Sequence, residues 1–152
     1  MQKTIIGVRG QPDSGKTTVI IRAHGELSKG GKCVYSNPRG DGREIKEVLE
    51  IDGVHVGFVS AGDKPDRLAG SLRFLLRKGC VVIVCARLNR SGEPVHGTIE
   101  AVEQFSRDNG FNPEWIDKRR QSRDRDKADR EVADEIVAKV HAAIAIAQPV
   151  EV

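Results

Sequence analysis

Gly10, Gly15, Lys16 and Thr17 have the residue types and the spacing of a phosphate-binding turn. They fit the pattern GxxxxGK followed by Ser or Thr without a mismatch. Two glycines let backbone N–H groups converge on an anion, and a helix that begins near Gly15 would add the positive end of its dipole. Lys16 would reach the β- and γ-phosphates of a nucleotide, and the Thr17 hydroxyl would bind Mg²⁺. The pattern therefore predicts a site for a nucleoside triphosphate and its metal ion.

The sequence on either side of these residues places the turn between a strand and a helix. Apolar residues dominate Thr4–Arg9, which is typical of a buried strand, and Gly15–Lys29 carries apolar residues at helical spacing. Such a junction would leave the turn at the carboxyl end of the strand, where α/β sheets bind their ligands. We expect the nucleotide to contact Gly10, Pro12, Asp13, Ser14, Gly15, Lys16, Thr17 and Thr18.

The segment Gly10–Thr18, with the sequence GQPDSGKTT, resembles the phosphate loop of the P-loop NTPase superfamily. The match is specific over these nine residues, and elsewhere it rests on the alternation of strands and helices. The resemblance implies a bound nucleotide, ATP or GTP, together with Mg²⁺. Recognition of guanine would need an Asn/Thr-Lys-x-Asp signature. Its nearest counterpart, residues 89–92, lacks the acid, so we expect ATP.

A carboxylate ligand for the metal ion is less clearly marked in the sequence than the Thr17 hydroxyl. P-loop proteins usually hold Mg²⁺ or its water with an aspartate at the end of another strand. The most apolar predicted strand, Val81–Cys85, carries no acid at its end. Asp63 follows the strand Val54–Val59, so we expect it to serve as the acid on the metal side, together with Thr17. The alternative is that Asp63 caps the helix that begins after it.

Two arginines, Arg87 and Arg90, follow the strand Val81–Cys85. This stretch resembles the short arginine-bearing lid of nucleotide kinases, in which arginines neutralise charge on the transferring phosphoryl group. The resemblance implies catalytic roles for Lys16, Arg87 and Arg90, with Asp63 beside them. A solvated loop is the alternative. A second basic cluster, Lys118–Arg130, contains interleaved aspartates, which predict a solvated start to the last helix. A nucleotide lid and a partner-binding patch are the alternatives there.

Strands and helices are expected to alternate five times along the chain. This alternation predicts a single α/β domain over residues 1–150, with three layers and a five-stranded parallel sheet. We expect Cys80–Ala86 at the centre of the sheet and Asn112–Asp117, which contains a proline, at an edge. The predicted strands are Thr4–Arg9, Lys32–Ser36, Val54–Val59, Cys80–Ala86 and Asn112–Asp117. The predicted helices cover residues 15–29, a short stretch after 41 with Ile45, Val48 and Leu49 on one face, and residues 64–78, 98–109 and 126–147.

The composition of the 152 residues limits the remaining function classes. Aromatic residues make up 4% and the net charge is +3, a poor basis for a nucleic-acid surface. The sequence contains neither a membrane-length apolar run nor a signal-peptide pattern, so we expect a cytoplasmic protein. Three cysteines without a CxxC spacing argue against a disulfide framework or a zinc site. We expect Cys33, Cys80 and Cys85 to be buried, with Cys80 and Cys85 on opposite faces of one strand.

These features favour a small Mg²⁺-dependent phosphotransferase of the kinase type or an NTP hydrolase. The partners would be a nucleotide and an unidentified small-molecule or protein acceptor. The alternative is a nucleotide-dependent switch or adapter that acts by binding other proteins. In support of the alternative, the first 36 residues resemble the start of the molybdopterin-guanine dinucleotide biosynthesis adapter proteins, and the similarity ends near Ser36.

Overall fold

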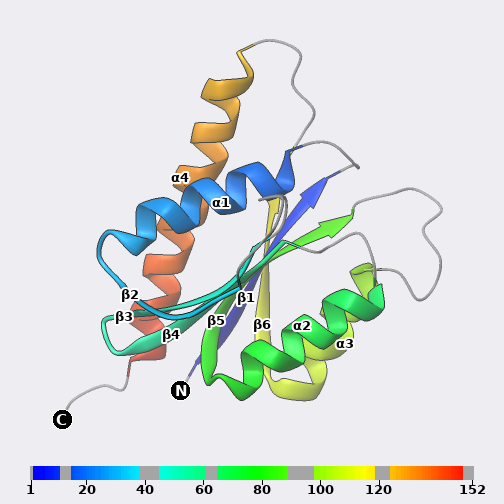
Figure 1. Cartoon of the computed structure of the whole chain (residues 1–152). Helices are drawn as coiled ribbons and strands as arrows, with labels where there is room; N and C mark the ends of the chain where they lie inside the picture. Colours follow the sequence, from blue (N-terminus) through cyan, green and yellow to red (C-terminus); the bar gives the residue numbers. More distant parts are fainter. Residues whose placement is uncertain are drawn as a thin grey trace.

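The computed structural model describes residues 2–10, 15–37, 45–60, 65–88, 98–118 and 124–148. These residues form one α/β domain, in which a six-stranded, mostly parallel sheet is covered by helices on both faces (Figure 1). Several predicted site residues lie outside the described ranges, and of Arg87 only the backbone is described. Those outside are Pro12, Asp13, Ser14, Asp63 and Arg90.

The strands lie in the order β2-β3-β4-β5-β1-β6. Strand β3 is antiparallel to both of its neighbours, and the run β4-β5-β1-β6 is parallel throughout. The prediction of five parallel strands is therefore wrong by one strand. The elements are β1 Lys3–Gly10, α1 Lys16–Ser28, β2 Lys32–Ser36, β3 Lys46–Ile51, β4 Val54–Val59, α2 Pro65–Arg77, β5 Cys80–Leu88, α3 Thr98–Asn109, β6 Phe111–Asp117 and α4 Arg125–Ala147.

The additional strand, β3, stands where the sequence predicted a short helix. Ile45, Val48 and Leu49 have the spacing of a helical face, but the backbone of β3 is extended. Val48 packs with the helices of one sheet face, and Leu49 packs with those of the other. A strand that is buried on both faces reads as a continuous apolar run, and periodicity alone does not distinguish it from a short buried helix.

A two-residue turn joins β3 to β4. Asp52 has φ 52° and Gly53 has φ 79°, both in the left-handed region, and Ile51 pairs with Val54 across the turn. An Asp-Gly pair between two apolar runs is a strong sequence signal for a hairpin of this type. This signal was available in the sequence and outweighs the helical spacing that precedes it.

The predicted positions of two strands within the sheet are confirmed. Strand β5 lies between β4 and β1, so it is central, and β6 forms one edge. The register sets Arg9 beside Arg87 and Gly10 beside Leu88. The end of β1 that leads into the predicted phosphate turn therefore lies directly beside the end of β5.

Helices cover the two faces in pairs. Helices α1 and α4 pack together on one face, and α2 and α3 pack together on the other (Figure 1). The chain leaves β1 toward α1 and leaves β5 toward α3, so the connections from these two neighbouring strands run to opposite faces. The carboxyl ends of β1 and β5 thus flank the switch point at which open α/β sheets bind ligands.

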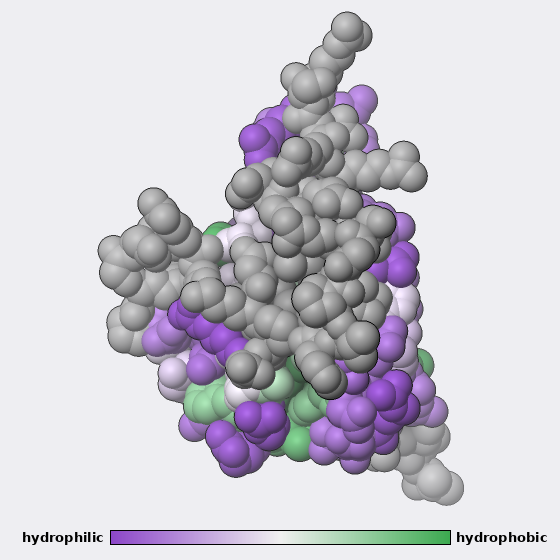
Figure 2. All heavy atoms as spheres, turned by 90° about the vertical axis from the view of Figure 1, so that its right-hand side faces the viewer, coloured by the Kyte–Doolittle hydropathy of each residue, from purple (hydrophilic) through white to green (hydrophobic). Residues whose placement is uncertain are grey.

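The surface of the described residues is largely polar. In the view of Figure 2, hydrophilic residues dominate the described atoms and a small hydrophobic area lies in the lower part. Within the described ranges, the large hydrophobic side chains that remain exposed are Val34 and Ile146. No described helix combines the length and apolar character that crossing a membrane would require.

Gly7 offers a test of the packing between β1 and β6. A Cβ atom on Gly7 would overlap the indole ring of Trp115, whereas a Cβ on Gly25 of α1 would meet nothing within 4 Å. We expect Gly7→Ala to lower the free energy of unfolding by about 1–3 kcal/mol through overpacking. The control, Gly25→Ala, should raise it by about 0.5–1 kcal/mol because alanine favours a helix interior. Urea unfolding measures both, and a neutral Gly7→Ala would contradict the described packing.

Candidate phosphate-binding site

Gly15 forms the junction between the predicted phosphate turn and α1. It is the N-cap residue and has φ 95°, a left-handed conformation that glycine adopts without strain. Its carbonyl accepts the first hydrogen bond of the helix, from the Val19 N–H at 3.1 Å. Within the part of the chain that the structure describes, no side chain caps this end, and the first turn contains no acidic residue. The positive end of the α1 dipole would therefore favour an anion here.

Lys16 is the buried cation of the site. The residue is 6% exposed, and its Nζ donates a hydrogen bond to the carbonyl oxygen of Gly10 at 3.1 Å. This bond joins the last residue of β1 to the first residue of α1, across the segment that separates them. An ammonium group at this position is close to any phosphate that the turn would hold. The structure thus places Gly10, Gly15 and Lys16 at the ends of β1 and α1 that face each other.

Two further predicted contacts, Thr17 and Thr18, lie in the first turn of α1. Thr17 is half-buried and Thr18 is exposed. A half-buried hydroxyl beside the free N-terminus of a helix is a suitable oxygen ligand for Mg²⁺. Among the described residues, no group of three metal-ligating side chains occurs. The proposed acid, Asp63, lies outside the described ranges, and so does the alternative in which it caps α2.

Ser60 occupies the first position after β4, where a metal-side acid would be expected. It is 6% exposed, and its Oγ accepts a hydrogen bond from the Ile45 N–H at 2.7 Å. The Ser60 N–H in turn donates to the Ile45 carbonyl at 3.0 Å. Ser60 therefore fastens the open end of the β3–β4 hairpin, and the acid, if it comes from this connection, must come from a later residue.

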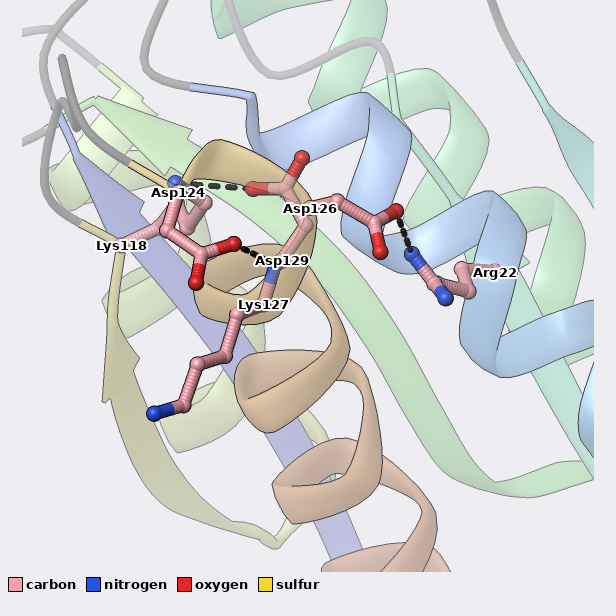
Figure 3. A network of polar contacts seen from close by, with 6 residues as sticks. All are labelled: Arg22, Lys118, Asp124, Asp126, Lys127 and Asp129. Carbon is pink, nitrogen blue, oxygen red and sulfur yellow. Dashed lines mark hydrogen bonds and ion pairs between the residues drawn. The ribbon is translucent and has the colours of Figure 1, made fainter.

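A buried ion pair beside Gly15 was not predicted from the sequence. The Lys118 Nζ lies 3.1 Å from the Asp129 Oδ1, and the side chains are 1% and 8% exposed (Figure 3). The cluster Lys118–Arg130 was expected to be solvated, and this expectation is wrong for these two residues. The expectation of a solvated cluster is correct for five described residues that are exposed, namely Asp124, Arg125, Asp126, Lys127 and Arg130. Asp129 lies one turn inside α4 on the face toward α1, a position that helical spacing could have indicated.

Helix α4 begins beside the same ion pair. Asp124 caps it by accepting a hydrogen bond from the Lys127 N–H at 3.3 Å. Asp126, in the first turn of α4, pairs with Arg22 of α1 at 3.1 Å on the surface (Figure 3). The start of α4 thus pairs with α1 through an exposed ion pair and with the end of β6 through a buried one.

A second, partly buried network joins α1 to the β2–β3 pair. His24 of α1 places Nε2 3.0 Å from the Glu47 Oε2, and the Ser36 Oγ donates to the Glu47 Oε1 at 3.0 Å. The His24 ring also packs edge-on against Phe58, with 5.0 Å between ring centroids. These contacts hold α1 against β2, β3 and β4. No spacing in the sequence indicated this network, because its polar members come from three separate elements.

Comparisons with known proteins identify no family for this chain. No family model matches it, and no curated protein sequence matches it. Among solved structures, it is similar to the structure titled "Crystal structure of APE1195", with a TM-score of 0.46 and 18% identity, covering 99% of this chain and 81% of that one. It is also similar to a mutant of the Mycobacterium tuberculosis APS kinase CysC, with a TM-score of 0.44 and 15% identity, covering 89% and 97%. At these TM-scores neither likeness supports an inference about function.

The cysteines differ from their predicted arrangement. Cys33 is exposed on the edge strand β2, whereas Cys80 and Cys85 are buried. Cys80 and Cys85 lie in the same core cluster rather than on opposite faces. The reason is a register shift between β4 and β5, in which His55 pairs with Cys80 but Val56 pairs with Val82. The extra residue reverses the alternation of side chains at this point.

Cysteine reactivity tests this arrangement. Burial raises the pKa of the Cys80 thiol from 9.0 to about 12. The neutral thiol therefore supports the folded state fully below pH 9, and this contribution to stability is lost as the pH rises from 9 toward 12. At pH 8 we expect iodoacetamide to label Cys33 in the native chain, and to label Cys80 only after unfolding in urea. Peptide mass spectrometry locates the label, with Cys33→Ser as the control. Equal labelling rates at Cys33 and Cys80 in the native chain would contradict the structure.

Proposed function

We propose that this chain binds a nucleoside triphosphate with Mg²⁺ through residues 10–18 and transfers its terminal phosphoryl group to a small acceptor or to water. One observation carries the proposal. The buried Lys16 ammonium lies at the N-terminus of α1 and donates a hydrogen bond to the Gly10 carbonyl at the end of β1. A lysine ammonium beside the positive end of a helix dipole is an arrangement that favours phosphate oxygens as ligands.

The electrostatics of α1 favour an anion over any other ligand at this position. The helix dipole is positive at its N-terminus, and the first turn adds no carboxylate that would cancel it. The location also fits, because β1 ends beside β5 at the switch point of the sheet. The charge and the position in the sheet therefore both agree with a phosphate group.

Mg²⁺ would be held by the Thr17 hydroxyl, and we propose Asp63 as the carboxylate on its other side. When bound, the ion would neutralise charge on the phosphate oxygens. Lys16 would hold the β- and γ-phosphates in position, and the N-terminus of α1 would stabilise the negative charge that moves toward the leaving oxygen. The leaving group is the nucleoside diphosphate, and the bond formed joins phosphorus to an acceptor oxygen.

We propose that Arg87 and Arg90 neutralise charge on the transferring group. The backbone of Arg87 pairs with Arg9 at the carboxyl end of β5, beside the strand that leads into the phosphate turn. The Arg87 backbone thus lies one strand spacing, about 4.8 Å, from that of Arg9 in β1. Its planar guanidinium suits two phosphate oxygens at once.

The Lys16→Ala variant tests nucleotide binding. We expect its affinity for Mg-ATP to fall about 10- to 100-fold, since charged hydrogen bonds of about 1.5–3 kcal/mol are lost. Isothermal titration calorimetry measures this affinity, with Lys29→Ala as a control because Lys29 is an exposed lysine directly after the same helix. Wild-type affinity in Lys16→Ala would overturn the phosphate assignment. Parallel titrations with GTP test the expected preference for ATP.

Asp63→Asn tests the proposed metal-side acid. We expect this variant to need about tenfold more Mg²⁺ to reach half of its maximal ATP affinity, because a neutral amide binds the hard cation more weakly. A Mg²⁺ titration at fixed ATP gives this midpoint, and Asp108→Asn on the exposed side of α3 is the control. An unchanged midpoint would leave Asp63 with only the helix-capping role.

Measuring ADP formation with and without an added acceptor distinguishes hydrolysis from phosphoryl transfer. Formation of ADP without an added acceptor indicates hydrolysis, whereas formation that depends on a nucleoside, nucleotide or small alcohol indicates a kinase. Lys16→Ala supplies the background rate for every acceptor. Nucleotide binding without turnover above this background on any acceptor would contradict the enzymatic part of the proposal and favour a switch or an adapter.

A further inference from the structure

Lys118 contacts both ends of the phosphate turn. It follows β6, and its backbone N–H donates a hydrogen bond to the Arg9 carbonyl at 2.7 Å, one residue before the end of β1. Its side chain lies against the other end of the turn, where its Cε is 3.4 Å from the position that a Cβ on Gly15 would occupy. One residue thus fixes the separation between the strand that enters the turn and the helix that leaves it.

Asp129 holds the Lys118 side chain in this position. Their charged atoms are 3.1 Å apart, and both side chains are almost fully buried (Figure 3). Asp129 also borders Gly15 directly, with its Oδ1 3.6 Å from the same Cβ position. The turn therefore rests on a buried ion pair whose acid belongs to α4 and whose base belongs to the end of β6.

Stability alone does not account for this pair. Removing two charges from water costs several kcal/mol per ion, and replacing a buried pair by apolar residues of similar volume is often neutral or stabilising. A buried pair does, however, enforce a specific geometry when its atoms contact a functional segment. Lys118 and Asp129, together with Arg125, border the space beside Gly15 that a side chain would occupy, and Gly15 is the one left-handed residue at the start of α1.

We propose that Lys118 and Asp129 are positioning residues of the phosphate site, which hold Gly15 and the N-terminus of α1 in the conformation that receives the anion. The inference rests on the proposed function. The pair acts through Gly15, whose carbonyl receives the first hydrogen bond of α1 from Val19. It also prevents an uncompensated Asp129 carboxylate from repelling phosphate, since Lys118 neutralises that charge at close range.

The double variant Lys118→Met/Asp129→Leu removes both charges and keeps an apolar contact. We expect thermal unfolding within a few degrees of wild type, because neither charge is left unpaired. In the absence of ligand, the Val19 amide should exchange its hydrogen about tenfold faster, as measured by NMR, because Gly15 is less restrained. The affinity for inorganic tripolyphosphate, measured by calorimetry, should fall about tenfold. Lys118→Met/Asp129→Asn is the second variant if the leucine overpacks the site.

The matched control is Arg22→Gln/Asp126→Asn, which removes the exposed ion pair between α1 and the first turn of α4. It should leave both the Val19 exchange and the tripolyphosphate affinity within about twofold of wild type. Wild-type exchange and affinity in the buried-pair variants would overturn the positioning role. An effect of equal size in the control would also overturn it, since any contact between α1 and α4 would then suffice.

Failure of the proposed function gives a different result. In that case the wild-type chain itself would not bind tripolyphosphate, or Lys16→Ala would bind it equally well. The Val19 exchange needs no ligand, so it reports separately whether Lys118 and Asp129 restrain the turn.

Discussion

The backbone of β1 is hydrogen-bonded along both edges, to β5 on one side and to β6 on the other. Helices cover both of its faces, so Ile5, Ile6 and Val8 have no contact with water. The end of β1 therefore lies between β5 and β6. There the backbone of Arg9 pairs with that of Arg87 in β5, and the Arg9 carbonyl accepts a hydrogen bond from the Lys118 N–H after β6.

Two buried lysines lie near the start of α1. The Lys118 Nζ lies beside the Asp129 carboxylate, so this pair contributes little net charge. The Lys16 Nζ donates a hydrogen bond to the Gly10 carbonyl. In our proposals Lys16 would hold phosphate, whereas Lys118 would support the residue that precedes Lys16.

Local patterns in the sequence were sufficient to predict the elements whose apolar residues recur at a single helical or strand spacing. They predicted the strands β2 and β4 with their bounds and the central place of β5. They failed at β3, because a strand buried on both faces has no alternation to detect. They also missed the burial of Lys118, whose described charged neighbours are exposed, whereas the burial of Asp129 agrees with helical spacing to Ala133 and Ile136. Local patterns also did not indicate the His24–Glu47 pair, because its two residues come from separate elements that only the tertiary fold brings together.

The phosphate motif is short, but the structure that supports it extends along almost the whole chain. The turn between β1 and α1 lies near the N-terminus, and the residues that border Gly15 come from the end of β6 and the first turns of α4. A chain that stopped before β6 would leave one edge of β1 without its hydrogen-bond partners, and Gly15 would lose its contact with Lys118. The nine residues of the motif therefore supply the groups that would contact phosphate, while their geometry depends on residues more than a hundred positions away.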